Sequence, residues 1–501
     1  MTVPSMARTF LAALEGGSAN HPALVVPDGP RLTYGALRDE AERMARTLAA
    51  LGVRRGDRVA TVLTRPADSV IAFFGAGLAA TAAPLNPGLT ETEYRALLSG
   101  VRARVVVVPP GQASAVRRAR TEGMLVVDAA LGADGKFRVD ANASGRQEPE
   151  HPSEEDVALV LHSSGTTGRP KRVALRHRHL MESAERIRDT YGLSPEDVSL
   201  AVMPLFHVHG LVASVLAVLR SGGTVLLPPR FDHAAFSSLA ADHSVTWCTA
   251  VPTFHQLVLA RCRADAPRPS RLRFLRSASA KLSLRTLTDL EARFAVPVIE
   301  AYGMTEAAHQ IASNPLPPGR RVPGSVGPGT GVRVAVVDEQ SRFVTEAMPG
   351  EVVIRGPNVI ERYDDDPEAD AGSFVDGWFR TGDAGSLDTD GYVRLAGRIR
   401  EVINRGGEKI MPLEIDEVLG SHPAVAAAAC FGTPHPLLGE EVAAAVVLRQ
   451  PVSKGVLLRH CRERLAAFKI PKRLFIVAEL PRTPLGKVSR LRLASLLGVA
   501  A

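Results

Sequence analysis

The sequence predicts an α/β protein with a large, multi-lobed N-terminal domain of parallel sheets, helices and a small β-rich unit, followed by a small α+β domain. The first observation is length, because 501 residues exceed the roughly 250 to 300 that one hydrophobic core supports. The second is the alternation of helix-like and strand-like stretches from Leu32 to about Val108. The third is that Arg400 to Ala501 carries helix and strand patterns of its own.

The first half of the chain supplies the parallel-sheet elements. A helical pattern spans Tyr34 to Leu51, and apolar runs from Arg58 to Leu63 and from Val105 to Val108 are typical of buried strands. A polar stretch with two prolines, from Ala141 to Asp156, predicts a surface connection between two lobes. Further buried strands are predicted at Val157 to Leu161, Thr224 to Leu227, Thr246 to Ala250 and Val296 to Ile299.

The β-rich unit follows a loop of clustered Gly and Pro from Gly319 to Gly331. Its predicted strands are Val332 to Val337, Gly350 to Ile354 and Gly391 to Leu395. The C-terminal domain is expected to contain a helix that begins at Pro412, strands at Val425 to Phe431 and Val442 to Leu448, and a helix from Val456 to Ala467.

Composition excludes several classes of function. The net charge is +7, but the basic residues are spread along the chain, so small polyanions are more probable ligands than nucleic acid. Four cysteines without a CxxC pair argue against a disulfide framework and a zinc site. The chain starts without a signal-peptide pattern and contains no membrane-length apolar run. We therefore expect a cytoplasmic protein without stable membrane insertion.

The string LHSSGTTGRPK, from Leu161 to Lys171, combines a strand end with glycines, hydroxyl side chains and a lysine. Such a loop can hold phosphates through backbone N–H groups, hydroxyls and a positive charge, although the spacing is not that of a Walker motif. The alternative is a polar turn without a ligand. The candidate phosphate-binding residues are Ser163, Ser164, Gly165, Thr166, Thr167, Gly168 and Lys171.

Five strings together resemble the superfamily of acyl-CoA synthetases, luciferases and peptide-synthetase adenylation domains. They are the phosphate loop, EAYGMTEAAHQ from Glu300, GWFRTGDAGSLDTDGYVRLAGR from Gly377, REVINRGGEKIMPLEIDEVL from Arg400 and PRTPLGKVSR from Pro481. They occur in the family order and cover nearly the whole chain. The resemblance implies an N-terminal AMP-binding domain at 1–398 and a mobile C-terminal domain at 399–501.

In this family the second string lies at the adenine, the phosphates and the metal. The resemblance places adenine against the ring of Tyr302 and makes the neighbouring residues Ala301 and Gly303 part of the nucleotide-binding site. It also implies that Thr305 contacts the α-phosphate and that Glu306 binds Mg²⁺. A carboxylate together with phosphate oxygens is a suitable ligand set for this hard cation. Taken alone, a Thr-Glu pair more often begins a helix.

The third string implies the ribose contacts. Asp383 resembles an aspartate that accepts hydrogen bonds from both ribose hydroxyls, and Arg398 resembles an arginine that also reaches the ribose. A simple turn at Gly382 and Asp383 is the alternative.

The last two strings imply a catalyst that works in two conformations. Lys487 resembles the mobile lysine that reaches the forming acyl-phosphate bond, and Gly406 and Gly407 match a loop that approaches the pantetheine channel during thioester formation. Arg400 stands at the hinge, where relatives usually carry Lys or Asp, and Arg172 stands where many carry Gly. We expect the C-terminal domain to swing about Arg400 between the two steps.

The acid-binding strings PLFHVHG from Pro204 and RSASAKL from Arg276 resemble those of oxalate:CoA ligases. The resemblance assigns His207, also a catalytic candidate, together with Ser279 and His309 to the distal carboxylate, and imidazole and hydroxyl groups suit a small dianion. The His207-x-His209 spacing also permits packed core histidines or, least favoured, a metal pair. Lys281 stands where oxalate enzymes usually carry a small residue, and this lysine could suit another acidic substrate. Malonate-specific relatives tend to carry arginine just before the tyrosine of YGMTE, so Ala301 disfavours malonate.

We therefore expect an ATP-dependent acid:CoA ligase that forms an acyl-adenylate and then an acyl-CoA thioester, with Mg²⁺ as cofactor, on a small dicarboxylic acid such as oxalate. The alternatives are a ligase for a medium-chain or aromatic acid, an adenylation enzyme that loads a carrier-protein thiol, and a nucleotide sensor. We expect no carrier domain after Ala501, and Lys487 argues against a sensor. The expected oligomeric state is a monomer or a homodimer.

Overall fold

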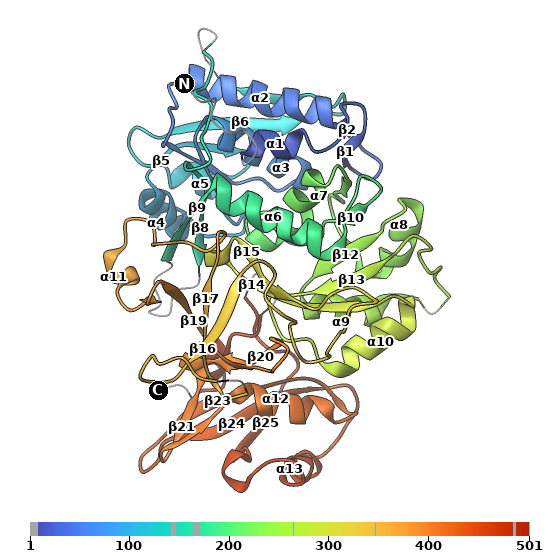
Figure 1. Ribbon diagram of the computed structural model, residues 1–501, viewed down its shortest axis with the longest axis vertical. Helices are drawn as coiled ribbons and strands as arrows, with labels where there is room; N and C mark the ends of the chain where they lie inside the picture. The colour runs from blue at the N-terminus through green and yellow to red at the C-terminus, as the bar shows by residue number, and fades with distance from the viewer. Residues whose placement is uncertain are drawn as a thin grey trace.

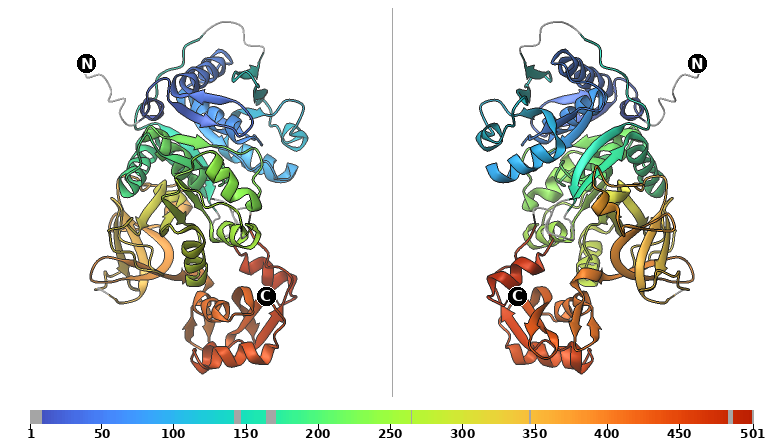
Figure 2. Two further views of the ribbon diagram at one scale, coloured as in Figure 1. Left: turned by 90° about the vertical axis from the view of Figure 1, so that its right-hand side faces the viewer. Right: turned by 90° about the vertical axis from the view of Figure 1, so that its left-hand side faces the viewer.

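The computed structural model describes residues 9–141, 147–163, 171–263, 265–345, 347–483 and 487–499. Two large sheets with their helices form the upper body, a smaller β-rich unit lies beside them, and the C-terminal part of the chain forms a separate lobe below (Figures 1 and 2). This arrangement confirms the predicted fold class.

The first sheet contains seven strands in the order β7-β6-β5-β3-β4-β8-β9. Its central pairs are parallel, whereas β7 and β9 are antiparallel strands at the two edges. In their order across the sheet, the strands are β7 (Phe137–Asp140), β6 (Leu125–Leu131), β5 (Ala103–Val108), β3 (Arg58–Thr61), β4 (Thr81–Pro84), β8 (Val157–Ser163) and β9 (Lys171–Arg176).

The second sheet contains eight strands in the order β15-β14-β13-β12-β10-β11-β1-β2, with antiparallel strands at both edges. These strands are β15 (His309–Ser313), β14 (Val298–Met304), β13 (Phe274–Ser277), β12 (Trp247–Ala250), β10 (Val198–Leu200), β11 (Thr224–Leu226), β1 (Pro22–Val25) and β2 (Arg31–Thr33). Because parallel strands end at the same edge, β12, β13 and β14 bring their carboxyl ends together.

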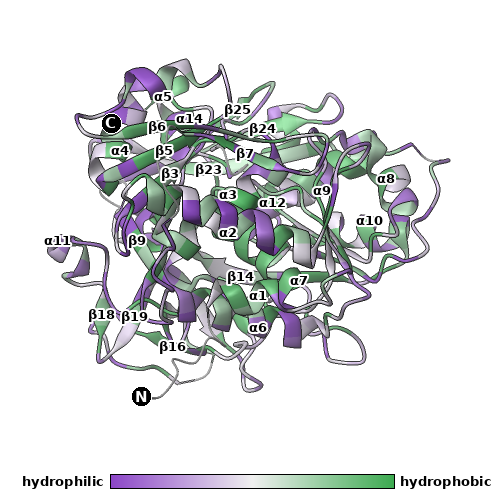
Figure 3. Cartoon of the chain, turned by 90° about the horizontal axis from the view of Figure 1, so that it is seen from above, coloured by the Kyte–Doolittle hydropathy of each residue, from purple (hydrophilic) through white to green (hydrophobic). Residues whose placement is uncertain are grey.

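One buried core contains residues from both sheets and from the helices associated with them. Helix α3 (Pro66–Ala79) is apolar on nearly all sides and packs on α2 (Tyr34–Ala50). The N-cap of α2 is Thr33, whose hydroxyl accepts from the Ala36 amide at 3.2 Å. A Cβ at Gly75 would lie 2.7 Å from the Met44 Cβ, so glycine permits this close approach. From above, hydrophobic residues concentrate on the central strands and hydrophilic residues on α5 (Ser114–Arg118) and α11 (Pro367–Asp370) (Figure 3).

The helices of the N-terminal part, with one π-helical segment at His209–Leu216, lie on these sheets or connect their strands. They are α1 (Phe10–Leu14), α2 (Tyr34–Ala50), α3 (Pro66–Ala79), α4 (Glu91–Val101), α5 (Ser114–Arg118), α6 (His177–Tyr191), α7 (Ala217–Arg220), α8 (Phe236–Asp242), α9 (Pro252–Arg261), α10 (Leu284–Phe294) and α11 (Pro367–Asp370).

The β-rich unit is a five-stranded antiparallel sheet. It consists of β16 (Arg333–Val337), β17 (Gly350–Arg355), β18 (Phe374–Val375), β19 (Trp378–Leu387) and β20 (Val393–Arg398). Strand β20 ends at the short turn Ile399–Glu401, after which the chain enters the lower lobe.

The lower lobe has its own sheet and cores, which contain no residue before Ile403. The strands are β21 (Ile403–Arg405), β22 (Glu408–Ile410), β23 (Val425–His435), β24 (Gly439–Leu448) and β25 (Arg473–Ile476). The helices are α12 (Pro412–Ser421), α13 (Lys454–Arg462) and α14 (Arg490–Leu496). None of the described helices, in either part of the chain, combines the length and apolarity needed to cross a bilayer.

Candidate active site

A buried tyrosine-aspartate-arginine group forms one end of the site. Tyr302, in the last part of β14, donates its hydroxyl to Asp383 Oδ2, and Arg398 Nε donates to Asp383 Oδ1 at 2.8 Å. The pairing of β19 with β20 sets Asp383 opposite Arg398 in the sheet. The structure therefore brings together the residues expected to contact adenine and ribose.

Burial raises the pKa of Asp383, although the Arg398 guanidinium and the Tyr302 hydroxyl both favour its ionised form. A carboxylate has about four lone-pair positions, and these two partners use two of them. Asp383 thus keeps acceptor capacity for a diol. Burial also raises the pKa of Tyr302, so the phenol stays protonated and acts as a donor.

The turn Thr305–Ala307 directly after β14 holds the expected metal ligand. Glu306 is 6% exposed, and its Oε1 accepts a hydrogen bond from the Tyr363 hydroxyl at 3.1 Å. The ammonium of Lys171, at the start of β9, lies 4.6 Å from the centroid of the Tyr363 ring. Thr305 is half-buried beside Glu306.

This donor set fits Mg²⁺. Among the residues that the structure describes, Tyr363 alone donates a side-chain hydrogen bond to the buried Glu306 carboxylate, which leaves lone pairs for a cation. Mg²⁺ is usually held by one or two carboxylates together with phosphate oxygens rather than by a cage of side chains. Within the described ranges no group of three or more His, Cys, Asp or Glu residues is placed to hold a metal alone. The site thus suits a cation that arrives with the phosphates.

Lys487 comes from the lower lobe and is partly buried at the same site. Burial and the nearby Arg398 lower its pKa, against the opposing charges of Asp383, Glu306 and Glu401. Burial, followed by the charge of Lys487, also lowers the pKa of His207 to about 4. The charge of Lys487 therefore acts on groups at both the nucleotide end and the acid-binding end of the site.

The acid-binding end contains two histidines in a stack. His209 and His309 have ring centroids 4.9 Å apart at an interplanar angle of 21°. His209 Nδ1 lies 3.1 Å from Ser279 Oγ, and its Nε2 lies 2.7 Å from Thr249 Oγ1. Because both ring nitrogens have these partners, His209 is unsuited to bind a metal with His207.

A fully buried arginine lies behind this stack. Arg276 in β13 is 0% exposed and donates to the Tyr191 hydroxyl at 2.7 Å, to Thr249 Oγ1 at 2.9 Å and to Gln310 Oε1 at 3.0 Å. All three partners are neutral, and Arg276 forms no ion pair with any carboxylate in the described part of the chain. Burial and the Arg276 charge hold the pKa of His309 well below its usual value.

These contacts define a direction of hydrogen bonding. Arginine can only donate, so Thr249 accepts from Arg276 and donates its own proton to His209 Nε2. His209 then carries its proton on Nδ1 and donates to Ser279 Oγ. The hydroxyl proton of Ser279 remains for an acceptor in the site, such as a carboxylate oxygen.

A close backbone approach fixes His309. A Cβ at position 303 would lie 1.9 Å from the His309 carbonyl oxygen, so Gly303 allows β14 and β15 to meet there. His309 itself has a φ of 104°, a backbone conformation that residues other than glycine rarely adopt. Its buried Nε2 has no hydrogen-bond partner among the residues that the structure describes.

The remaining predicted residues have different positions. Gly406 and Gly407 form an exposed turn between β21 and β22 with φ of 59° and 94°, which requires glycine, and Arg400 is exposed in the turn after β20. Ala301 is buried in β14, and Ser163 ends β8. The rest of the predicted phosphate loop lies outside the described residues: Ser164, Gly165, Thr166, Thr167 and Gly168.

Lys281 and Arg172, which both depart from the family pattern, form ion pairs with carboxylates of the chain. Lys281 forms an ion pair with Glu417 of α12, so its ammonium is directed to the lower lobe rather than to the acid. Arg172, which stands where many relatives carry Gly, pairs its guanidinium with Asp364 at 3.2 Å.

Sequence reasoning missed Arg276, Thr249 and Tyr363 as members of the site. Arg276 stood inside the quoted RSASAKL string, but its partners are 27 to 85 positions away in sequence. An arginine within an otherwise apolar buried strand is the one signal that could have identified it.

Family models match most of the chain. The model described as AMP-binding enzyme matches residues 12–364, and the AMP-binding enzyme C-terminal domain matches residues 414–487. The chain is 43% identical to an oxalate–CoA ligase of Arabidopsis thaliana over 93% of this chain and 94% of that protein. It is 37% identical to a sulfoacetate–CoA ligase of Cupriavidus necator over 98% of each chain.

Solved structures show the same architecture. ATP-bound MatB from Rhodopseudomonas palustris superposes with a TM-score of 0.89 at 31% identity, over 98% of each chain. The apo form of the same protein covers the same share of each chain at 31% identity and gives a TM-score of 0.79. The arrangement described above thus agrees better with the ATP-bound form.

Proposed function

Because the chain belongs to the AMP-binding enzyme family and is an AMP-forming acid:CoA ligase, we propose that its substrate is a small dicarboxylic acid such as oxalate. ATP and coenzyme A are the other reactants, and Mg²⁺ is the cofactor. One carboxylate of the acid would react, and the other would bind at the histidine stack.

The observation that carries this proposal is the buried cation Arg276, which has no anionic partner among the residues that the structure describes. Removing a guanidinium from water costs on the order of several kcal/mol unless an anion compensates it. Its hydrogen bonds run through Thr249 and His209 to Ser279, which is left as a donor. A second carboxylate on the substrate would accept from Ser279 and lie in the field of Arg276.

The same pocket disfavours an apolar acid. An alkyl or aromatic group against Ser279 and His309 would give no hydrogen bond to the Ser279 hydroxyl proton or to the buried His309 Nε2, at about 1 to 3 kcal/mol for each group. The two similar ligases named above act on oxalate and on sulfoacetate. Both acids are small and carry a second anionic group, which supports the same substrate class here.

The residues of the nucleotide end would divide the adenylation step between them. Tyr302 would stack on adenine, Asp383 and Arg398 would hold the ribose, and Thr305 and Glu306 would face the phosphates. Bound Mg²⁺ would neutralise phosphate charge at Glu306. The substrate carboxylate oxygen would attack the α-phosphorus, pyrophosphate would leave, and Lys487 would stabilise the charge that develops there.

Thioester formation requires another surface of the lower lobe. We propose that this lobe, 399–501, rotates about Arg400 relative to 1–398, withdraws Lys487 and brings Gly406 and Gly407 to the site. The CoA thiolate would then attack the acyl carbonyl and AMP would leave.

Pyrophosphate release tests the proposal with ATP, Mg²⁺ and a panel of acids that contains oxalate, malonate, sulfoacetate, butyrate and benzoate, each with and without CoA. We expect turnover with oxalate, or with another small acid that has two anionic groups, and multiple turnovers only with CoA. Preference for butyrate or benzoate would contradict the proposed substrate class and would favour a ligase for an apolar acid. Turnover with a carrier-protein thiol but not with CoA would contradict the proposal that CoA accepts the acyl group.

A further inference from the structure

The segment between β17 and α11, residues 357–365, is not part of any of the five family strings, yet it lies against the nucleotide end of the site. We name it the 357–365 strap. Its Tyr363 is 5% exposed. The Tyr363 hydroxyl donates to Glu306 Oε1 at 3.1 Å, and the face of its ring receives the Lys171 ammonium at 4.6 Å. One side chain thus connects the lysine of the phosphate loop with the expected metal ligand.

Backbone contacts join the strap to the turn that carries Glu306. The Ile360 amide donates to the Glu306 carbonyl at 2.9 Å. The side-chain amide of Asn358 donates to the backbone carbonyls of Ala307 at 2.7 Å and Gln310 at 2.9 Å. These bonds fix the distance between the strap and Glu306 independently of the Tyr363 hydroxyl.

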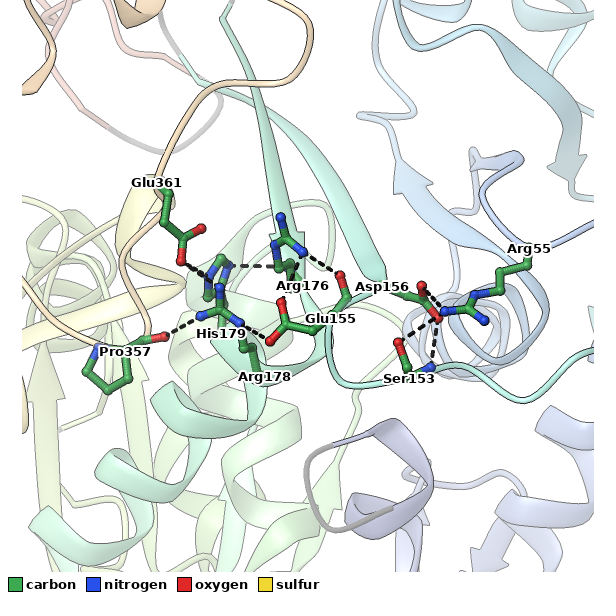
Figure 4. A network of polar contacts seen from close by, with 9 residues as sticks. All are labelled: Arg55, Ser153, Glu155, Asp156, Arg176, Arg178, His179, Pro357 and Glu361. Atoms are coloured by element: carbon green, nitrogen blue, oxygen red, sulfur yellow. Dashed lines mark hydrogen bonds and ion pairs between the residues drawn. The ribbon is translucent and has the colours of Figure 1, made fainter. Parts of the chain in front are cut away.

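An ion cluster anchors the strap before Tyr363. Arg178 at the start of α6 donates to Glu361 Oε1 at 2.5 Å and to the Pro357 carbonyl at 3.4 Å, and His179 Nε2 lies 3.5 Å from the same carboxylate oxygen. Figure 4 shows these side chains converging from α6 and from the strap, with Glu155 on the opposite side of Arg178.

A second ion cluster anchors the strap after Tyr363. Arg58 in β3 pairs with both oxygens of Asp364 at 2.6 and 2.7 Å, and Arg172 Nε donates to Asp364 Oδ2 at 3.2 Å. The Asp364 amide also donates to the Arg172 carbonyl at 3.0 Å. Since Arg172 follows Lys171 in β9, the same pairing holds Lys171 beside Tyr363.

We propose that Tyr363 is a positioning residue of the adenylation site, which sets the spacing between Lys171 and Glu306 so that both meet one Mg²⁺-bound triphosphate. The hydroxyl orients the Glu306 carboxylate, and the ring restrains the Lys171 side chain through cation–π attraction. The two ion clusters hold the tyrosine in place from both sides. This inference rests on the proposed roles of Glu306 and Lys171.

Tyr363→Phe tests the hydroxyl without removing the ring. Equilibrium binding of ATP would be measured by calorimetry, without any acid, in the presence of Mg²⁺ and in EDTA. We expect the variant to lose about fivefold to tenfold in affinity for ATP with Mg²⁺ and to keep its affinity in EDTA. Tyr363→Leu also removes the ring, and we expect it to weaken binding under both conditions.

Tyr392→Phe is the matched control. Tyr392 is also buried, donates its hydroxyl to the Arg320 carbonyl at 2.6 Å and has the Arg320 guanidinium 5.4 Å from its ring centroid, but lies outside the site. Its binding should equal that of the unmodified protein in both buffers. An equal loss in Tyr392→Phe would indicate a general structural effect and would overturn the inference.

Glu306→Gln separates this inference from its premise. If Glu306→Gln loses the Mg²⁺ dependence of ATP binding while Tyr363→Phe retains it, the positioning role of Tyr363 is wrong. If Glu306→Gln binds ATP with Mg²⁺ as tightly as the unmodified protein, the metal role proposed for Glu306 is wrong, and the inference falls with it. The expected pattern is a large effect in Glu306→Gln and a smaller one of the same kind in Tyr363→Phe.

Discussion

Ser279 shows how a neutral hydroxyl can be given a fixed hydrogen-bonding role by residues that do not touch the ligand. It accepts from His209, which in turn accepts from Thr249, which accepts from Arg276. A serine in water donates and accepts equally well, whereas this one is left with its proton available. The proposed preference for an anion would therefore belong to the chain of four residues and not to Ser279 alone.

Ser279→Ala removes only the last donor of that chain. We expect kcat/KM for oxalate to fall about 10- to 100-fold, because a hydrogen bond to a charged group contributes about 1.5 to 3 kcal/mol, while KM for ATP stays unchanged. Pyrophosphate release at varied oxalate and ATP measures both values. Ser238→Ala is the control, since that hydroxyl donates to the Ala235 carbonyl on an exposed helix. An undiminished rate with oxalate would contradict the proposal.

At the scale of elements, periodicity predicted the regular strands and helices well. The predicted helix at Tyr34 to Leu51 corresponds to α2, and the predicted strands at Thr246 to Ala250 and Gly350 to Ile354 correspond to β12 and β17. The segment His209–Leu216 was not predicted because it is buried on all sides and shows no helical alternation. Strand β14 continues past Ile299 through buried polar residues that interrupt its apolar pattern.

The candidate site was predictable to the extent that its residues stand in contiguous strings. Tyr302, Asp383 and Arg398 were expected at the nucleotide, and the structure brings them into direct contact. Arg276 and Tyr363 were not expected, because their roles depend on side chains from elements that are distant in the sequence. No local spacing reports such a contact, and only the folded chain creates it.

Helix α12 of the lower lobe meets the N-terminal part of the chain through the ion pair of Glu417 with Lys281. Both groups are partly exposed, so the pair should contribute no more than about 1 kcal/mol. In the structure it occurs together with Lys487 at the site. We therefore expect it to favour the conformation that forms the adenylate over the one that forms the thioester.

Lys281→Glu places two like charges at this contact. We expect pyrophosphate exchange to slow about twofold to fivefold, while thioester formation from supplied acyl-adenylate is unaffected or faster, and we expect the swapped variant Lys281→Glu with Glu417→Lys to recover exchange. Arg285→Glu is the control, since Arg285 pairs with Asp289 within one helix. Equal slowing of both steps would show that the pair acts on overall stability instead.

The whole molecule should lose stability in mild acid. Burial lowers the pKa of four histidines, His162, His177, His207 and His255, to about 4. In the unfolded chain each of these histidines has its ordinary pKa of about 6.5 and therefore binds a proton more readily than in the folded protein. Their neutral forms therefore stabilise the fold fully above pH 6.5, and this contribution is lost as the pH falls towards 4.

Urea unfolding between pH 4 and pH 8 measures this effect. We expect the unfolding free energy to fall by at least about 3 kcal/mol from pH 6.5 to pH 4, and His177→Gln to reduce the slope. His151→Gln is the control, because His151 is exposed. A free energy that stays constant through this range would contradict the assignment of neutral buried histidines.

The close contact between Gly303 and the His309 carbonyl limits how this enzyme can be retargeted to new acids. Any side chain at position 303 would push β15 away, and His309 would move with it. A directed-evolution library that varies positions 303 and 309 would thus consist mostly of proteins with a damaged nucleotide site, since Tyr302 precedes this glycine. Positions 207, 249 and 279 offer a safer route, because they can change the pocket while leaving the crossing of the two strands intact.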